Sequence, residues 1–145
     1  MPKRIRIRVG DVVAEAALFE DQAPKTVAAL WDRLPLLNER TIQVRWSGDA
    51  WRTVGDYELL TKDDEIENRI ERLGAGDVAY YPGYHSGNFK ICFAYGKAQW
   101  LAPFMVPLAV SRIGKIDVNL DAFVAASQRI IFDGPLDVEV TRIED

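Results

Sequence analysis

Hydrophobic and polar residues alternate at the start of the chain, a pattern typical of β-strands with one buried face. Residues 4–9 alternate arginine with isoleucine and valine, a clear period of two. Residues 12–19 are apolar on both faces apart from Glu15, so they predict a strand that is covered on both sides. Gly10 and Asp11 separate the two runs, and glycine at the first turn position favours a type II′ turn. The chain is therefore predicted to open as a β-hairpin.

A helical period follows this hairpin. From Val27 to Leu34 the residues at i, i+3, i+4 and i+7 are apolar, which gives one hydrophobic stripe. Pro24 suits the first helical position because its fixed φ already matches a helix. Pro35 ends the helix because the residue before a proline is disfavoured in the α region. The acidic residues 20–21 favour the positive end of the helix dipole. These signals predict an amphipathic helix between the two prolines.

The rest of the chain alternates short apolar runs with glycine and proline turns, which is typical of a mainly β protein. Residues 36–40 are interpreted as a connector, and the polar region 56–72 as a solvated helix or loop. A second helix is predicted near Asp117 to Ser127, with Asn119 or Asp117 as its cap. Strands are predicted at 41–46, 50–54, 78–81, 89–95, 98–101, 129–132 and 136–143. About eight strands and two helices indicate a barrel or a sandwich, and in a barrel the two helices would cap the ends.

Composition describes one ordinary globular domain, residues 1–145. The chain is 48% hydrophobic and 28% charged with a net charge of −4, which gives no reason to expect nucleic acid or an anionic membrane as a partner. No apolar run approaches the roughly 20 residues of a membrane span, and the N-terminus lacks the apolar core of a signal peptide. A single cysteine cannot form an internal disulfide, so a cytoplasmic location is expected. One histidine and one cysteine far apart offer no ligand set, so neither a metal nor a cofactor is expected.

Several short motifs resemble those of the cyclophilins. Leu18-Phe19 is followed by A-P-K-T at 23–26 and by the helix that ends at Leu34. Further along, the chain is similar to the DUF3830 group of uncharacterised bacterial cyclophilin-like proteins. This similarity rests on V-R-W-S-G at 44–48, G-D-V at 76–78, Y-P-G at 81–83 and A-Y-G at 94–96. The resemblance implies a closed cyclophilin-like barrel with helices over its ends.

Cyclophilins are peptidyl-prolyl isomerases, so the resemblance raises that activity. Arg45 matches the position of the family's active arginine, but the phenylalanine, methionine and glutamine of the proline pocket are absent around it. Trp100-Leu101 resembles the family's tryptophan-leucine pair, without the histidine that follows it. Proline isomerisation needs an apolar slot for the ring as well as a donor. We therefore expect weak or no isomerase activity, and a protease-coupled proline-peptide assay without acceleration would eliminate it.

Two hairpins and a proline-flanked loop carry the candidate site residues. An arginine could hold a carboxylate, aromatic rings could enclose a planar body, and a histidine could move a proton near neutral pH. The candidates are Arg45 and His85 as catalytic groups and Trp46, Trp51, Tyr81 and Phe104 as ligand contacts. Alternatives remain for several of them, because the pattern favours core packing for the two tryptophans and an exposed loop position for the histidine.

Two functions of different classes remain open. The first is binding of a small carboxylate-bearing or aromatic molecule on the barrel, with or without enzymatic activity. It requires Arg45 and His85 to converge on a concave pocket. The second is a noncatalytic oligomerisation or protein-binding module, in which Phe104, Met105 and the strand edges contact another subunit. A flat apolar patch would favour this second function and a homo-oligomer.

Overall fold

The strands and helices of the barrel are described for most of the chain. The structure is a computed structural model, and it describes residues 2–44, 48–83, 88–99, 101–102, 106–107 and 109–144. The strands are β1 (Arg4–Val9), β2 (Val12–Leu18), β3 (Leu36–Arg40), β4 (Ile42–Gln43), β5 (Gly48–Arg52), β6 (Arg69–Ile70), β7 (Arg72–Leu73), β8 (Asp77–Gly83), β9 (Asn88–Gln99), β10 (Leu101–Ala102), β11 (Val106–Pro107), β12 (Val110–Val118) and β13 (Asp137–Ile143). The helices are α1 (Pro24–Arg33), α2 (Leu120–Gln128) and α3 (Ile130–Asp133).

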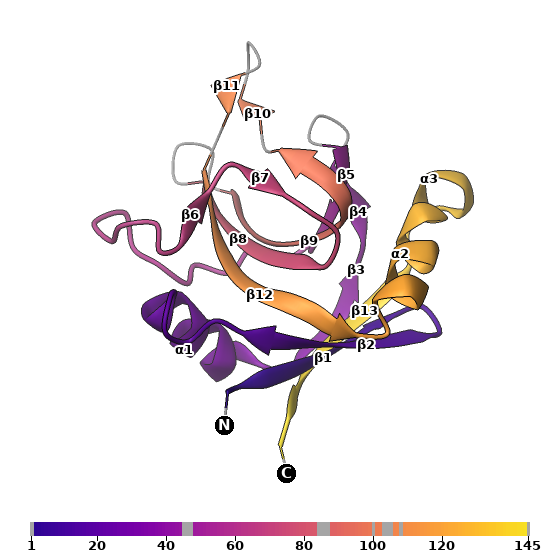
Figure 1. The fold of residues 1–145 in the computed structure, drawn as a ribbon, viewed down its shortest axis with the longest axis horizontal. Helices are drawn as coiled ribbons and strands as arrows, with labels where there is room; N and C mark the ends of the chain where they lie inside the picture. Colours follow the sequence, from indigo (N-terminus) through magenta and orange to yellow (C-terminus); the bar gives the residue numbers. More distant parts are fainter. Residues whose placement is uncertain are drawn as a thin grey trace.

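Nine antiparallel strands form a nearly closed barrel (Figure 1). Their order is β3-β13-β1-β2-β12-β8-β9-β5-β4, while β6 pairs with β12, β7 with β9, and β10 with β11. The edge strands β3 and β4 are consecutive in the chain, with only Thr41 between them. Thr41 donates its backbone N–H to the Leu136 carbonyl at 3.0 Å, and its hydroxyl oxygen accepts the Leu136 N–H at 3.0 Å. The chain itself therefore spans the gap between the edges, and the expected mainly β barrel is confirmed.

β1 and β2 form the predicted hairpin. Val9 pairs with Val12 across the turn, and of the two turn residues only Gly10 has a positive φ, +58°, as a type II′ turn requires. The isoleucines of β1 are fully buried and its arginines face outward. The alternation in the sequence thus defines the inner and outer faces of this strand.

The barrel interior is an apolar cluster around Trp51. Its indole is fully buried, stacks on Phe93 with 4.4 Å between ring centroids, and donates its N–H to the Ser127 hydroxyl at 3.0 Å. Phe123 of α2 lies 6.1 Å from the same indole, so α2 packs against the open side of the barrel. Truncation of a buried aromatic residue typically costs about 3–5 kcal/mol, which makes this cluster a main source of stability.

A second apolar cluster lies on the opposite face of β5, β8 and β9. Its buried members are Ala50, Leu73, Ala79, Cys92, Ala94, Ala98 and Val110. Parts of these three strands are therefore covered on both faces, which explains the apolar runs at Val78–Tyr81 and Ile91–Tyr95. Burial raises the pKa of the Cys92 thiol, so the cysteine stays protonated and acts as packing in this layer.

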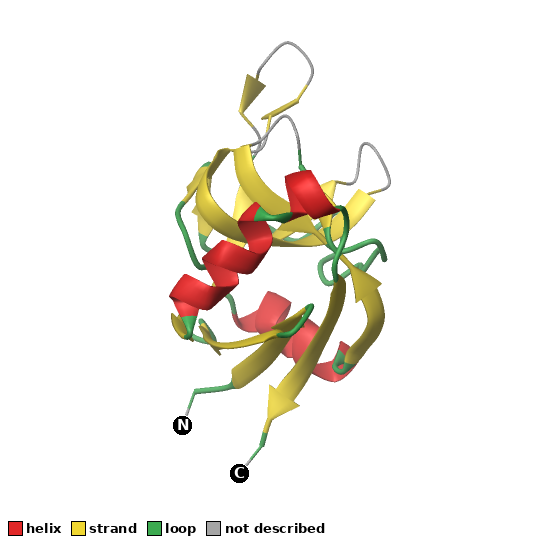
Figure 2. Ribbon diagram, turned by 90° about the vertical axis from the view of Figure 1, so that its right-hand side faces the viewer, coloured by secondary structure: helices red, strands yellow, loops and turns green. Residues whose placement is uncertain are grey.

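The two longer helices lie on opposite sides of the barrel (Figures 1 and 2). α1 begins at Pro24 and ends before Pro35, as the two prolines predicted. α2 packs against β2, β5 and β9, and its buried Phe123 reaches the interior cluster. Among the described residues, no helix is long and apolar enough to cross a membrane.

The N-terminus of α1 is capped by a residue distant in sequence. Glu67 accepts the backbone N–H of Lys25 at 3.2 Å and that of Thr26 at 2.7 Å. The acidic residues before the helix do not take this role, because Glu20 is paired with Lys3 at 2.8 Å. The expected favourable charge at the helix dipole is therefore present but comes from Glu67.

The predicted connector at 36–40 is strand β3, which pairs with β13. The connector interpretation is therefore wrong. The sequence did not indicate a strand because one of the two buried positions of β3 is a glutamate, Glu39, so the segment lacks apolar alternation. The buried carboxylate accepts the N–H groups of Val54 at 2.8 Å and Gly55 at 3.1 Å and the hydroxyl of Tyr57. Burial is the main cause that raises the pKa of Tyr57, and the hydrogen bond to Glu39 raises it further. The phenol therefore keeps the proton that it donates.

The strand predicted at 129–132 is wrong, because this segment belongs to the turn after α2 and to α3. The Arg129 N–H bonds to the Ala126 carbonyl at 3.2 Å, and the Asp133 N–H bonds to the Arg129 carbonyl at 2.7 Å. The Arg129 guanidinium also pairs with the Asp133 carboxylate at 2.7 Å, a spacing that supports a helix. Gly134, with φ +89°, follows the helix. These local bonds override the β-branched composition of the segment.

Three further assignments are settled by the structure. The region 56–72, which is described throughout, contains turns and short strand segments and no helix, so its loop interpretation is the correct one. Residues 110–116, which the sequence patterns left unassigned, belong to β12, which joins β2 to β8 and runs to Val118, so the helix predicted from Asp117 begins only at Leu120. Asn119 occupies the N-cap position of α2 with φ +62°, but its side chain donates to the Val13 carbonyl at 2.9 Å and does not cap the helix.

Candidate functional site

Two of the six sequence-predicted site residues are described, and they lie on opposite faces of the sheet. Trp51 is fully buried in the barrel interior, in agreement with its core-packing alternative. Tyr81 is half-buried and packs against the outer cluster. A ligand on the outer face would therefore contact Tyr81 and not Trp51. The other four predicted residues, Arg45, Trp46, His85 and Phe104, lie outside the described residues, and their roles stay predictions.

The two predicted hairpins are attached at opposite ends of β9. The β8–β9 hairpin closes at Gly83 and Asn88, whereas the start of β5 pairs with Ala98, near the other end of β9. A straight strand from residue 88 to residue 98 would span roughly 33 Å, although β9 curves around the barrel (Figure 1). The described ends of the turn that carries Arg45 and of the loop that carries His85 are thus separated along β9. Convergence of these two side chains stays a prediction.

A cleft of about 690 Å³ lies between the β4–β5 hairpin and α3. Its volume is in the range of small-molecule sites, about 300–1,000 Å³. The described residues that line it are Thr41, Ile42, Gln43, Gly48, Asp49, Ile130, Ile131 and Pro135. Aliphatic side chains come from both walls, and the polar groups come from the barrel side. The cleft therefore combines an apolar surface with a few polar atoms, as ligand sites usually do.

Gln43 joins the hairpin turn to a buried tyrosine. Its Nε2 donates to the Gly48 carbonyl at 2.9 Å, and its Oε1 accepts the Tyr95 hydroxyl at 2.7 Å. Burial raises the pKa of Tyr95 by more than the hydrogen bond to Gln43 lowers it. The phenol consequently stays protonated at neutral pH and holds Gln43 in place.

Asp49 owes its position to two glycines and a β-bulge. Between the pairs Gly48–Ala98 and Ala50–Ala94, the register between β5 and β9 shifts, so Asp49 faces a bulged stretch of β9 around Gly96. A Cβ at Gly96 would lie 2.5 Å from the Asp49 Oδ2, and a Cβ at Gly48 would lie 2.6 Å from the Lys97 carbonyl oxygen. Gly48 also has φ +99°, which other residues rarely adopt. Bulges of this kind commonly direct a side chain at a binding site.

The described lining supports binding more directly than catalysis. It contains one ionisable side chain, Asp49, and no histidine, cysteine, lysine or serine. Within the same described part of the chain, no group of three or more His, Cys, Asp or Glu side chains is arranged to hold a metal ion. A nucleophile or general base would have to come from residues beyond this lining.

Sequence reasoning identified the hairpin beside the cleft and missed the side chains that line it. Gly48 and Gly96 entered only as parts of family motifs, and Asp49 was not singled out. Ile130 and Ile131 were assigned to a strand, so their place across from the hairpin was not expected. The signal that indicates Asp49 is a Gly-Asp pair on one strand with a second glycine opposite it on the neighbouring strand. This signal can be recognised only when the register between β5 and β9 is known.

Comparison with solved structures identifies the fold. The solution structure of the hypothetical protein AF2241 from Archaeoglobus fulgidus matches with a TM-score of 0.61 and 25% identity, over 98% of this chain and 95% of that one. McbB in complex with tryptophan matches with a TM-score of 0.74 and 18% identity. That match covers 97% of this chain but 45% of McbB, so the present chain spans less than half of McbB.

Comparison at the sequence level identifies the family. Among curated proteins, none matches this chain. The model of DUF3830, described as a protein family of unknown function, matches residues 5–142 and thus nearly the whole barrel. The motifs that suggested this group from sequence are therefore explained, and the chain belongs to the DUF3830 family.

Proposed function

We propose that this protein binds a small molecule with an aromatic or apolar body in the cleft between the β4–β5 hairpin and α3. The observation that carries the proposal is the cleft itself, about 690 Å³ in volume and lined by aliphatic side chains with a single carboxylate. Ile42 lies on one wall, and Ile130 and Ile131 lie on the other. Such walls would take an apolar body out of water at a gain of roughly 25 cal/mol per Å² of buried apolar surface.

We propose that the polar group of the ligand is a carboxylate, with Arg45 as its partner. In the sequence, Arg45 comes between Gln43 and Gly48, two residues that line the cleft. The guanidinium of an arginine can form a bidentate pair with a carboxylate, so its place in the sequence between two lining residues supports this role for Arg45. McbB has been solved with tryptophan, an aromatic molecule that carries a carboxylate, and this supports the idea that the fold can hold a ligand of that class.

The test is a titration with tryptophan and 3-phenylpropionate, followed by NMR shifts of the backbone amides. We expect shifts concentrated on the cleft residues, and we expect Ile131→Glu to weaken binding about tenfold, which corresponds to about 1.4 kcal/mol. Ile131 is 63% exposed, so a glutamate there removes apolar contact with the ligand without unfolding the protein. Arg45→Ala is expected to weaken binding of both carboxylates by a similar factor.

Leu37→Glu is the matched control for the cleft variant. Leu37 is also an exposed aliphatic residue, 53% exposed, and it does not line the cleft. It should bind both probes as the wild type does. Shifts located elsewhere on the barrel, or equal weakening by Ile131→Glu and Leu37→Glu, would contradict a ligand site at this cleft.

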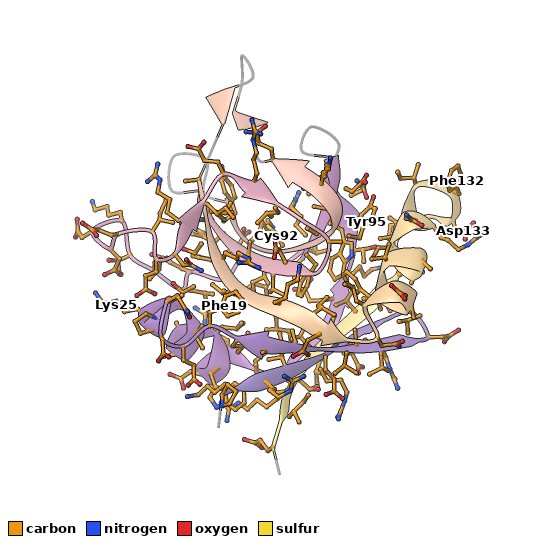
Figure 3. The ribbon with its side chains drawn as sticks, viewed as in Figure 1. Phe19, Lys25, Cys92, Tyr95, Phe132 and Asp133 are labelled. Carbon is orange, nitrogen blue, oxygen red and sulfur yellow. The ribbon has the colours of Figure 1, made fainter. Side chains whose placement is uncertain are left out.

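A second candidate function is noncatalytic assembly through α3. Phe132 is 82% exposed and Ile131 is 63% exposed, and Figure 3 shows Phe132 at the outer end of α3, directed away from the barrel. Large apolar side chains that project together into water are typical of contact surfaces. We propose a second copy of the chain as the partner.

A further inference from the structure

The cleft contains one polar side chain that the rest of the described structure leaves unused. Three of its lining residues have polar side chains. The Thr41 hydroxyl accepts the Leu136 N–H, and both ends of the Gln43 amide are engaged. Asp49 has no hydrogen-bond or ion-pair partner among the described residues. The carboxylate is thus available to a ligand that enters the cleft.

Two features of the backbone make room for this carboxylate at the cleft. Gly96 leaves the space that the Asp49 side chain occupies, because a Cβ there would lie 2.5 Å from Oδ2 and 2.8 Å from the Asp49 Cβ. Gly48 allows the close approach of β5 to the Lys97 carbonyl that sets the direction of the next residue. The two glycines therefore leave room for the Asp49 side chain beside β9.

The apolar walls face the same space as this carboxylate. Ile42 comes from the strand beside β5, and Ile131 and Pro135 come from α3 and the segment after it. A primary amine remains protonated at neutral pH, as a lysine side chain does, and it forms charge-assisted hydrogen bonds with a carboxylate. A ligand carboxylate placed directly beside Asp49 would instead be repelled, and a neutral hydroxyl there would gain less than an amine.

We infer that Asp49 is a specificity-determining residue of this cleft and selects ligands that carry a protonated amino group next to an aromatic or aliphatic body. The inference rests on the proposed function, because it places the ligand in the same cleft. Asp49 is exposed, so its contribution is that of a solvent-screened pair, about two- to fivefold in affinity.

The experiment compares two probes of the same size, 2-phenylethylamine and 2-phenylethanol, by calorimetric or NMR titration of the full chain. The wild type is expected to bind the amine about two- to fivefold more tightly than the alcohol. In Asp49→Asn the two affinities should become equal, with the alcohol unaffected. Raising the salt to about 1 M, where the Debye length is about 3 Å, should reduce the preference of the wild type.

Asp133→Asn is the matched control, because Asp133 is an exposed aspartate of α3 that pairs with Arg129 and does not line the cleft. It should keep the preference for the amine. Equal affinity of the wild type for both probes, or a preference that survives in Asp49→Asn, overturns the role of Asp49. In either case, loss of binding in Ile131→Glu would leave the proposed cleft function standing. Failure of both probes and of both aromatic carboxylates to bind at the cleft would overturn the two proposals together.

Discussion

Arg4 and Asp117 connect the first strand to the end of β12. The Arg4 guanidinium donates from Nη1 to Oδ2 at 3.0 Å and from Nη2 to Oδ1 at 2.6 Å. These hydrogen bonds hold the pKa of the Asp117 carboxyl below its ordinary value. A lowered pKa in the folded state means that the stabilisation is present above the pKa of the unfolded chain, about 3.9, and is lost as the pH falls through the folded value. The Asp117 side chain is 47% exposed, so the contribution is about 0.5 kcal/mol.

Arg4→Met should therefore raise the pKa of Asp117 toward its ordinary value, which an NMR titration of the carboxyl carbon measures directly. The free energy of unfolding should fall by about 0.5 kcal/mol at neutral pH, and the difference from the wild type should shrink below the folded pKa. Arg8→Met is the control, because Arg8 lies on the same strand and has no ion-pair partner among the described residues. An Asp117 pKa that is the same in both variants would show that the pair does not act as described.

Single residues show clearly where reading the sequence succeeds. The burial of Cys92 could be predicted because its neighbours alternate between apolar faces, and the positive φ of Gly10 because a tight hairpin requires it. The environment of Asp49 could not be predicted in this way. It depends on Gly96, a residue far away in the chain that lies beside Asp49 only through the register of β5 with β9. The pairing of distant strands determines the environment of Asp49, and the local sequence pattern does not reveal it.

At the scale of elements, the segments with strong and regular periods were predicted well. The opening hairpin, α1 and the aromatic face of β9 all follow from alternation or from an apolar stripe. β3 was missed because its inward position is the glutamate Glu39, whose partners come from the loop after β5. The segment before Gly134 was misread as a strand because β-branched residues favour strands, while its backbone continues the turn of α2. In both cases tertiary contacts override local preference.

The cap of α1 gives an element-scale prediction. Glu67 accepts two backbone N–H groups of the first helical turn and the Thr26 hydroxyl at 2.8 Å. Glu67→Ala leaves these donors without the carboxylate, so the free energy of unfolding should fall by about 1 kcal/mol, measured by urea denaturation. Glu65→Ala is the matched control, because Glu65 is an exposed glutamate of the same loop without a partner among the described residues. Equal stability of the two variants would mean that the cap contributes nothing.

At the scale of the whole molecule, the barrel defines the fold and leaves the chemistry to the cleft. Its strands bury a continuous interior, and β5, β8 and β9 carry a second buried layer outside it. The nearly closed circuit of strands also leaves few free edges for pairing with another chain. Assembly through a sheet edge is therefore disfavoured by the topology. Scaffolds of one fold serve unrelated functions, so the activity has to be established at the β4–β5 and α3 surface.

The exposed surface of α3 makes the state of assembly a test of the second candidate function. Ile131 lines the cleft and Phe132 projects beside it, so a dimer built on α3 would bury both residues and narrow access to the cleft. If this function is correct, light scattering should show a dimer of the wild type and a monomer of Phe132→Ser, and tryptophan should shift the equilibrium toward the monomer. Val118→Ser, another exposed apolar residue at 44%, should leave the dimer intact. A wild-type protein that stays monomeric at high concentration would exclude assembly through α3 and leave ligand binding as the role of this surface.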